Sequence, residues 1–142
     1  MTLNGQIIGQ AERATRAVLE ELLAEIGTTF VRWVTLNVLT TAGGRQQRDA
    51  LVQRVVDGLR TDAPPVLAAL DELTAAGHVR PTADDPAVVE VTDSGRAVYR
   101  RIQAGIDGIS ALLYADLPAA DLATAGRVLT IVTERATAAL AS

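Results

Sequence analysis

The sequence predicts a mainly α-helical fold in which a small pair of β-strands interrupts a series of helices. Over most of the chain, apolar residues recur at the three- and four-residue spacing of a helix. Two short segments, His78–Arg80 and Val88–Val91, instead consist largely of β-branched residues around a proline-bounded turn, Pro81–Pro86. The polar run Thr92–Ser94 then has the composition of a helix N-cap, so a new helix should follow the strands.

Three helices separated by glycines are predicted before the strands. Residues 6–26 carry one apolar stripe, and Gly27 ends that helix. Residues 29–41 are apolar on nearly every side, which is typical of a central buried helix. After Gly43 and Gly44, residues 46–58 have the spacing of a third helix.

A fourth helix should begin at Pro64 and Pro65, where a missing N–H group costs least, and should end at Gly77. Beyond the strands, helices are predicted from about Ser94 to Tyr114 and after Pro118. The order helix, turn, helix, strand pair and helix is that of a winged helix-turn-helix domain, whose strand pair is the wing.

Two motifs beside the predicted strands resemble those of the MarR family of bacterial transcriptional regulators. Leu73–Val79 corresponds to the end of the family's recognition helix, and Val91–Arg96 to the opening of the next helix. The order of elements matches the family over nearly the whole chain. The resemblance implies one domain, 1–142, with a winged-helix head at 28–93 and dimerisation helices at 1–27 and 94–142. It also implies a homodimeric, ligand-responsive regulator that binds double-stranded DNA. Surplus apolar residues in both terminal regions suit a symmetric dimer.

Composition narrows the class of protein. A chain of 142 residues that is 49% hydrophobic and 21% charged is expected to form one ordered domain. No apolar run approaches the ~18 residues of a membrane span, and the N-terminus lacks the pattern of a signal peptide. Cysteine is absent and His78 is the single histidine. We therefore expect a cytoplasmic protein with no metal, no cofactor and no membrane partner.

The residues expected to contact DNA depart from the family pattern. The first positions of the predicted recognition helix, Pro64–Ala68, offer no strong donor to a base edge, which leaves Thr61 and Asp62 in the preceding turn. The wing segment Asp84–Ala87 lacks the arginine that family members carry there. From Arg45 to Arg101, eight arginines stand against nine carboxylates, a net charge of −1 that predicts weak DNA binding. The candidates for phosphate contact are Arg45, Arg48, Arg60 and Arg80.

The family's ligand pocket is lined by the first, second and fifth helices, and the matching segments here contain suitable side chains. Arg32 needs a carboxylate partner if it is buried, while Phe30 and Trp33 present flat apolar surfaces. The resemblance thus implies a small aromatic or anionic ligand, contacted by Phe30, Arg32, Trp33, Asn37, Tyr99 and Tyr114. Two alternatives stay open: Trp33 can be ordinary core, and Arg32 can extend to solvent.

No catalytic residues are predicted, because the acidic pairs are explained as solvated groups and no nucleophile has a suitable partner. The unusual head nevertheless leaves a second hypothesis beside the DNA-binding regulator. A MarR-fold protein that has lost operator reading would act as a small-molecule-binding or repurposed catalytic protein. Pro64, Pro65 and the arginine-free wing favour this alternative, whereas Arg45, Arg48 and Arg60 favour the regulator.

Overall fold

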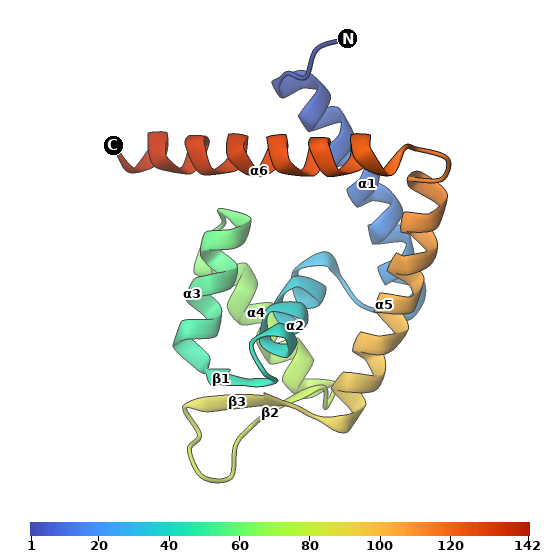
Figure 1. Cartoon of the computed structure of the whole chain (residues 1–142). Helices are drawn as coiled ribbons and strands as arrows, with labels where there is room; N and C mark the ends of the chain where they lie inside the picture. The colour runs from blue at the N-terminus through green and yellow to red at the C-terminus, as the bar shows by residue number, and fades with distance from the viewer. The chain divides into compact units, whose positions relative to one another are not determined.

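The computed structural model describes all residues, 1–142, and has six helices and a three-stranded antiparallel sheet (Figure 1). Two compact units make up the chain, residues 1–109 and 110–142. The predicted fold class, mainly α with a small β-wing, is confirmed. The elements are α1 (Gly5–Ile26), α2 (Phe30–Thr41), β1 (Arg45–Gln47), α3 (Arg48–Leu59), α4 (Ala63–Ala75), β2 (Val79–Pro81), β3 (Val88–Val91), α5 (Asp93–Leu113) and α6 (Ala119–Ala141).

Local signals in the sequence set most helix ends. The Asn4 side chain accepts a hydrogen bond from the Ile7 N–H at 2.9 Å, and Gly27 ends α1 in the left-handed conformation at φ 93°. Thr92 caps α5 by accepting from the Gly95 N–H at 3.0 Å, while its hydroxyl donates to the Gly77 carbonyl at 2.6 Å. Thr92 therefore fixes the start of α5 to the turn that follows α4.

The sheet contains one strand more than the sequence predicted. Its order is β1-β3-β2, so Arg45–Gln47 pairs with one edge of β3 and Val79–Pro81 with the other. The prediction of a helix over 46–58 was therefore wrong at its start, because α3 begins at Arg48. The prediction for His78–Arg80 was one residue early. The three residues of β1 are all polar and show no pattern typical of a strand. They are extended because β3 supplies their hydrogen-bond partners.

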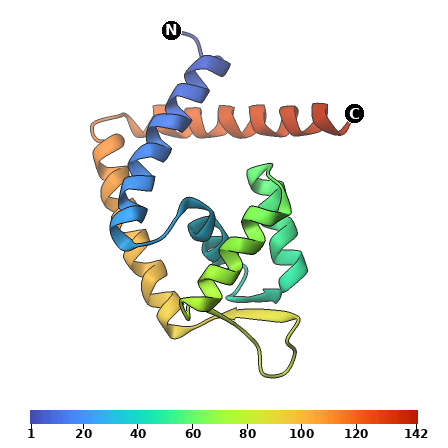
Figure 2. The same ribbon diagram turned by 180° about the vertical axis from the view of Figure 1, so that it is seen from behind.

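The core of the first unit forms around α2, which contacts α1, α3, α4, β1 and β3 (Figure 2). Its fully buried side chains include Leu36 and Leu39 from α2, with Leu51 and Val55 from α3. Gly95 lies against the His78 backbone, where an added Cβ would collide with the carbonyl oxygen. This contact explains the glycine of the second motif, since α5 could not otherwise approach the start of β2.

The second unit contrasts with this core because α6 has no buried residue. The exposed apolar side chains of the second unit include Tyr114, Leu117, Leu122, Leu129, Val132 and Leu140.

Taken alone, no helix has the length and apolar character to cross a membrane. Only α1 and α2 together, bent by 87° at their junction, reach that length and composition.

Candidate DNA-contacting surface and ligand cavities

Three charged side chains lie in register across the wing sheet. Glu90 in the central strand β3 faces Arg45 of β1 on one side and Arg80 of β2 on the other. The Arg80 Nε lies 3.1 Å from Glu90 Oε1, and the Arg45 Nη2 lies 3.4 Å from Glu90 Oε2. The hydrogen bond from Arg80, followed by the positive charges of Arg80 and Arg45, holds the pKa of Glu90 below its ordinary value. Two candidate phosphate-binding arginines thus share one carboxylate.

The other two candidate arginines flank α3. Arg48, at the first position of α3, has its Nη2 3.3 Å from Asp71 Oδ1 on α4. Arg60 ends α3 in the left-handed conformation, at φ 52°. Thr61 donates its backbone N–H to the Val56 carbonyl at 3.2 Å, and Asp62 occupies the N-cap position of α4 without a side-chain cap hydrogen bond. Arg45, Arg48 and Arg80 are thus each paired with a carboxylate of the head itself.

The remaining surface of the head offers little to a base edge. Pro64, Pro65 and Ala68 are exposed at the start of α4, while Val66 between them is buried. In the wing loop, the buried hydroxyl of Thr82 donates to the Asp85 carbonyl at 2.7 Å, and Asp85 Oδ1 accepts from the Ala87 N–H at 2.9 Å. The wing loop, residues 82–87 between β2 and β3, extends away from the helices in Figure 1. It is thus an acidic turn that is held by its own hydrogen bonds.

Three of the predicted ligand-binding residues lie together in the core. The rings of Trp33 and Tyr99 stack with centroids 5.4 Å apart and an interplanar angle of 29°. The Tyr99 hydroxyl donates to Asn37 Oδ1 at 3.1 Å. Trp33 is 7% exposed and packs in a cluster with Leu23 and Ile102. These contacts account for the three side chains as a satisfied packing unit of α2 and α5.

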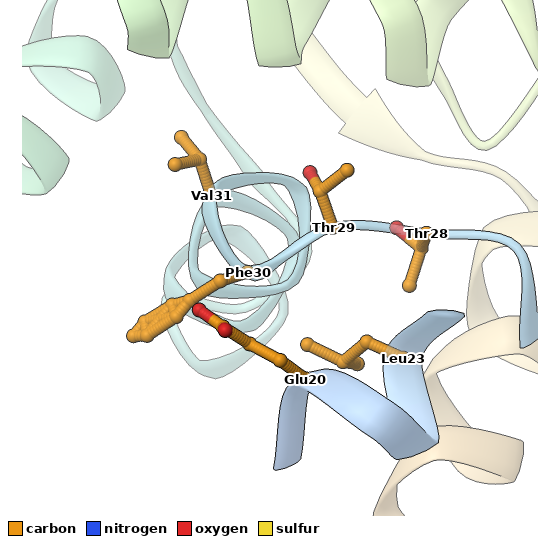
Figure 3. A pocket seen from close by; sticks show the side chains of 6 residues that line it. All are labelled: Glu20, Leu23, Thr28, Thr29, Phe30 and Val31. Carbon is orange, nitrogen blue, oxygen red and sulfur yellow. The ribbon is translucent and has the colours of Figure 1, made fainter. Parts of the chain in front are cut away.

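Phe30 packs against the same cluster and also lines a surface cavity between α1 and the start of α2. The cavity has a volume of about 370 Å³, and Figure 3 shows the six side chains around it, from Glu20 and Leu23 of α1 and from residues 28–31. Phe30 also lines a neighbouring cavity of about 330 Å³ with Arg60 and Thr61. The guanidinium of Arg16 lies 5.3 Å from the centre of the Phe30 ring. The sequence carries no signal for Arg16 at this site, because its contact with Phe30 depends on the packing of α1 against α2.

Arg32 lies at another cavity and has a protein partner. Both its Nε and its Nη2 contact Glu72 Oε2 on α4. The side chain of Arg32 is 28% exposed and that of Glu72 is 45% exposed. Arg32 is therefore half-buried, between the two alternatives that the sequence left open, burial and extension to solvent. Beside this pair is a cavity of about 170 Å³, whose other lining residues include His78 and Arg101. Arg32 therefore lines a different cavity from Phe30, and its ion pair with Glu72 joins α2 to α4.

Tyr114 belongs to the second unit, where it lines a cavity of about 360 Å³ with Leu122, Ala125, Gly126 and Leu129. No group of three or more histidine, aspartate or glutamate side chains is arranged to hold a metal ion. The six predicted ligand-binding residues are thus distributed among the packed core and several cavities.

Comparison with solved structures identifies the fold. A MarR-family regulator from Rhodococcus sp. RHA1 superposes with a TM-score of 0.76 at 16% identity, over 90% of each chain. The PcaV regulator from Streptomyces coelicolor gives 0.71 at 20% identity, over 96% of this chain and 99% of its own. CouR from Rhodococcus jostii RHA1, solved with p-coumaroyl-CoA, gives 0.75 at 14% identity, over 90% of each chain. In sequence, neither a family model nor a curated protein matches. The chain therefore has the fold of MarR-family transcriptional regulators.

Proposed function

We propose that the protein is a dimeric, ligand-responsive transcriptional regulator of MarR type whose phosphate-binding arginines are paired with its own carboxylates before it meets DNA. The observation that carries this proposal is the winged-helix fold, shared with a MarR-family regulator over 90% of the chain. Such a protein would work in the cytoplasm, at double-stranded DNA. The likeness of fold supports this class of function by analogy, and the arginines of the head are the proposed contacts to DNA.

DNA binding would require an exchange of partners on the wing and on α3. Arg45 and Arg80 would turn from Glu90 to phosphate oxygens, and Arg48 would leave Asp71. Arg60, with Thr61 and Asp62 in the turn between α3 and α4, would complete the contact surface. Each displaced carboxylate stays near the phosphate and repels it. An arginine that must leave a carboxylate therefore contributes less to DNA-binding free energy than an unpaired arginine would. We expect weak binding with a shallow salt dependence.

The test is a titration of the full chain against the promoter of its own gene at low and physiological salt. Replacement of Arg45, Arg48 or Arg80 by alanine should lower affinity about equally on every DNA sequence, because phosphate contacts carry no base information. Nanomolar, sequence-selective binding at physiological salt would contradict the proposed weakness of the head.

Absence of binding even at low salt would favour the second candidate function, a MarR-fold protein that has lost operator reading. The exposed Pro64, Pro65 and Ala68 support this alternative, because none of these side chains can donate a hydrogen bond to a base. Such a protein would bind, or act on, a small molecule without reading DNA.

The dimer would form through the terminal helices. Leu122, Leu129, Val132 and Leu140 recur at helical spacing on α6 and are exposed in the single chain. A symmetric partner would cover this stripe. Sedimentation at micromolar concentration should give twice the 14.9 kDa chain mass. Leu129→Glu should shift the protein to monomer, whereas Ala138→Glu, on another side of α6, should leave the dimer intact. A wild-type monomer would contradict the proposal.

A ligand response fits the cavities of the first unit and the precedent of CouR, solved with p-coumaroyl-CoA. A small aromatic molecule would lie on Phe30 near Arg16, where a ring and a cation already meet. Trp33 packs in the same cluster as Phe30, so binding should change the emission of this single tryptophan. Phe30→Ala should abolish that change, and loss of operator binding on adding the ligand would complete the test.

A further inference from the structure

The first two turns of α4 present an apolar surface to solvent. No residue from Ala63 to Leu70 has a polar side chain. The helix packs on the head through its buried residues, Val66, Ala69, Leu70 and Leu73. Pro64, Pro65 and Ala68 lie outside that buried side and are exposed. In a helix-turn-helix domain the base edges are contacted from the start of the second helix, which here consists of proline rings and a methyl group.

Hydrogen bonds to bases are not available to this surface. Pro64 and Pro65 have no backbone N–H group, so the first turn offers two donors fewer than an ordinary helix N-terminus. The next polar side chains along α4 are Asp71 and Glu72, and each is paired with an arginine of another helix. Their carboxylates accept hydrogen bonds and donate none. The start of α4 therefore has no side-chain donor for a purine acceptor in the major groove.

The major groove has one feature that is recognised without hydrogen bonds. Thymine carries a 5-methyl group there, and small apolar side chains such as that of alanine contact it. Uracil and cytosine lack this methyl group, whereas 5-methylcytosine has it at the same place in the groove. The methyl group of Ala68 and the rings of Pro64 and Pro65 are side chains of the type that this contact requires. The contact would remove apolar surface of both partners from water.

Arginines on two sides of this surface favour DNA as its partner. Arg60 ends α3 immediately before the turn into α4, and Arg48 lies beside Asp71, about one turn beyond Ala68. Both arginines are phosphate contacts in the proposed function. Pro64–Ala68 lies between these two positions along α4, so phosphates bound at both would bring base edges against it. A wholly apolar protein surface would leave both guanidinium groups without a new partner.

We propose that α4 recognises its DNA site through the 5-methyl groups of pyrimidines, with Pro64, Pro65 and Ala68 as the contacting side chains. This rests on the proposed function, because it requires α4 in the major groove. The arginines supply affinity for any sequence, and the methyl contacts add a preference for thymine at fixed positions. 5-Methylcytosine replaces thymine in these contacts, so methylation of a cytosine at such a position strengthens binding.

The test uses the full chain and a duplex that it selects at low salt from a random-sequence library. Each thymine of the selected duplex is replaced in turn by uracil, which removes the methyl group and keeps the base pair. At the contacted positions affinity should fall about threefold to fourfold, as expected for exposing one buried methyl-sized group. At one of these positions, 5-methylcytosine should bind more tightly than cytosine by a similar factor. A selected duplex without thymine at fixed positions, or an affinity that no uracil changes, overturns the proposal.

Two variants assign the effect to α4. Ala68→Gly removes the methyl group of the side chain, so uracil should no longer lower affinity at the position that Ala68 contacts. Ala75→Gly is the matched control, because it makes the same change at the exposed last residue of the same helix. The thymine-to-uracil affinity ratio is taken within each variant, so the cost of glycine in a helix, common to both, does not enter it.

Pro65→Ser gives an independent check at a second position if Ala68→Gly does not fold, because a polar hydroxymethyl group replaces the ring. A uracil profile that stays the same in both Ala68→Gly and Pro65→Ser overturns the role of α4. Failure of this proposal is distinguishable from failure of the proposed function. Equal affinity for thymine and uracil duplexes overturns the methyl contacts alone, whereas no binding to any duplex at low salt overturns both.

Discussion

Residues 1–109 and 110–142 are both rich in apolar side chains, but they use them differently. In the first unit Leu39, Leu51, Val55 and Val66 are 0% exposed, whereas α6 in the second unit has no buried residue. The difference is in available partners, because a single helix cannot cover its own apolar stripe. The winged-helix head buries its apolar side chains within one chain, whereas the apolar stripe of α6 is left exposed in the single chain.

The largest difference in the free energy of unfolding between the two units should appear when one leucine in each is replaced by alanine. Leu39→Ala leaves a cavity in a packed core and should lower the free energy of unfolding by about 2–5 kcal/mol. Leu129→Ala removes a side chain that is 38% exposed, so any loss should arise from weaker association. Urea unfolding at two protein concentrations distinguishes them, since only the Leu129→Ala effect should depend on concentration. Equal, concentration-independent losses would show that α6 is buried within its own chain.

A pair of glycines sharpens the comparison inside the first unit. An added Cβ at Gly95 would collide with the His78 carbonyl and lie 3.0 Å from Val91 Cγ1. Gly95→Ala should therefore destabilise by about 1–3 kcal/mol. At Gly58 in α3 nothing lies within 4 Å of the added atom, so Gly58→Ala should stabilise the helix by about 0.5–1 kcal/mol. Thermal unfolding of both variants measures the sign of each change in stability. A Gly95→Ala protein as stable as the wild type would mean that α5 can move away from β2.

The two tyrosines give a smaller contrast between the units. Tyr99→Phe keeps the ring stack with Trp33 but removes the hydroxyl that donates to Asn37, which should cost about 0.5–1.5 kcal/mol. Tyr114 is 49% exposed in the second unit, so Tyr114→Phe should leave the unfolding free energy unchanged within about 0.5 kcal/mol. Chemical denaturation measures both. A loss at Tyr114 as large as that at Tyr99 would place the second tyrosine in a packed environment.

Local patterns predicted the fold because its elements have strong local signals. Val88–Val91 is a run of β-branched residues and forms β3 with the predicted bounds, while Gly27 and Gly77 end helices as predicted. The strand at Arg45–Gln47 could not be predicted in this way. Its three polar residues are extended because they pair with β3, which lies more than forty positions later in the chain.

For the candidate sites, the sequence predicted which residues could take part but not which side chains they contact. The position of the candidate phosphate-contact arginines in the winged-helix order is visible in the sequence, but their carboxylate partners follow from folding. Glu90 is 45 positions from Arg45, and Glu72 is 40 positions from Arg32. Charge counting predicted a neutral-to-acidic head and could not predict that one glutamate serves two arginines. Pairings across strands and helices depend on register, which side-chain composition does not specify.

Glu90 gives the smallest stability effect and the clearest test of the head. Because Arg80 and Arg45 lower its pKa in the folded protein, its stabilising contribution is present at neutral pH. That contribution disappears as the pH falls from the ordinary glutamate range through the lowered pKa. Glu90→Gln should remove this part of the acid dependence of unfolding. Glu134→Gln in the second unit, which changes a carboxylate without an ion pair, should leave it unchanged.

The same Glu90→Gln variant should bind DNA more tightly than the wild type at low salt, because Arg45 and Arg80 no longer share a carboxylate. Its affinity should also fall more steeply with salt, by up to about 0.9 in the logarithmic slope for each additional phosphate contacted. Titrations at several salt concentrations measure that slope. If Glu90→Gln and wild type have the same affinity and slope, Arg45 and Arg80 do not contact DNA, and the wing sheet is not part of the DNA-binding surface.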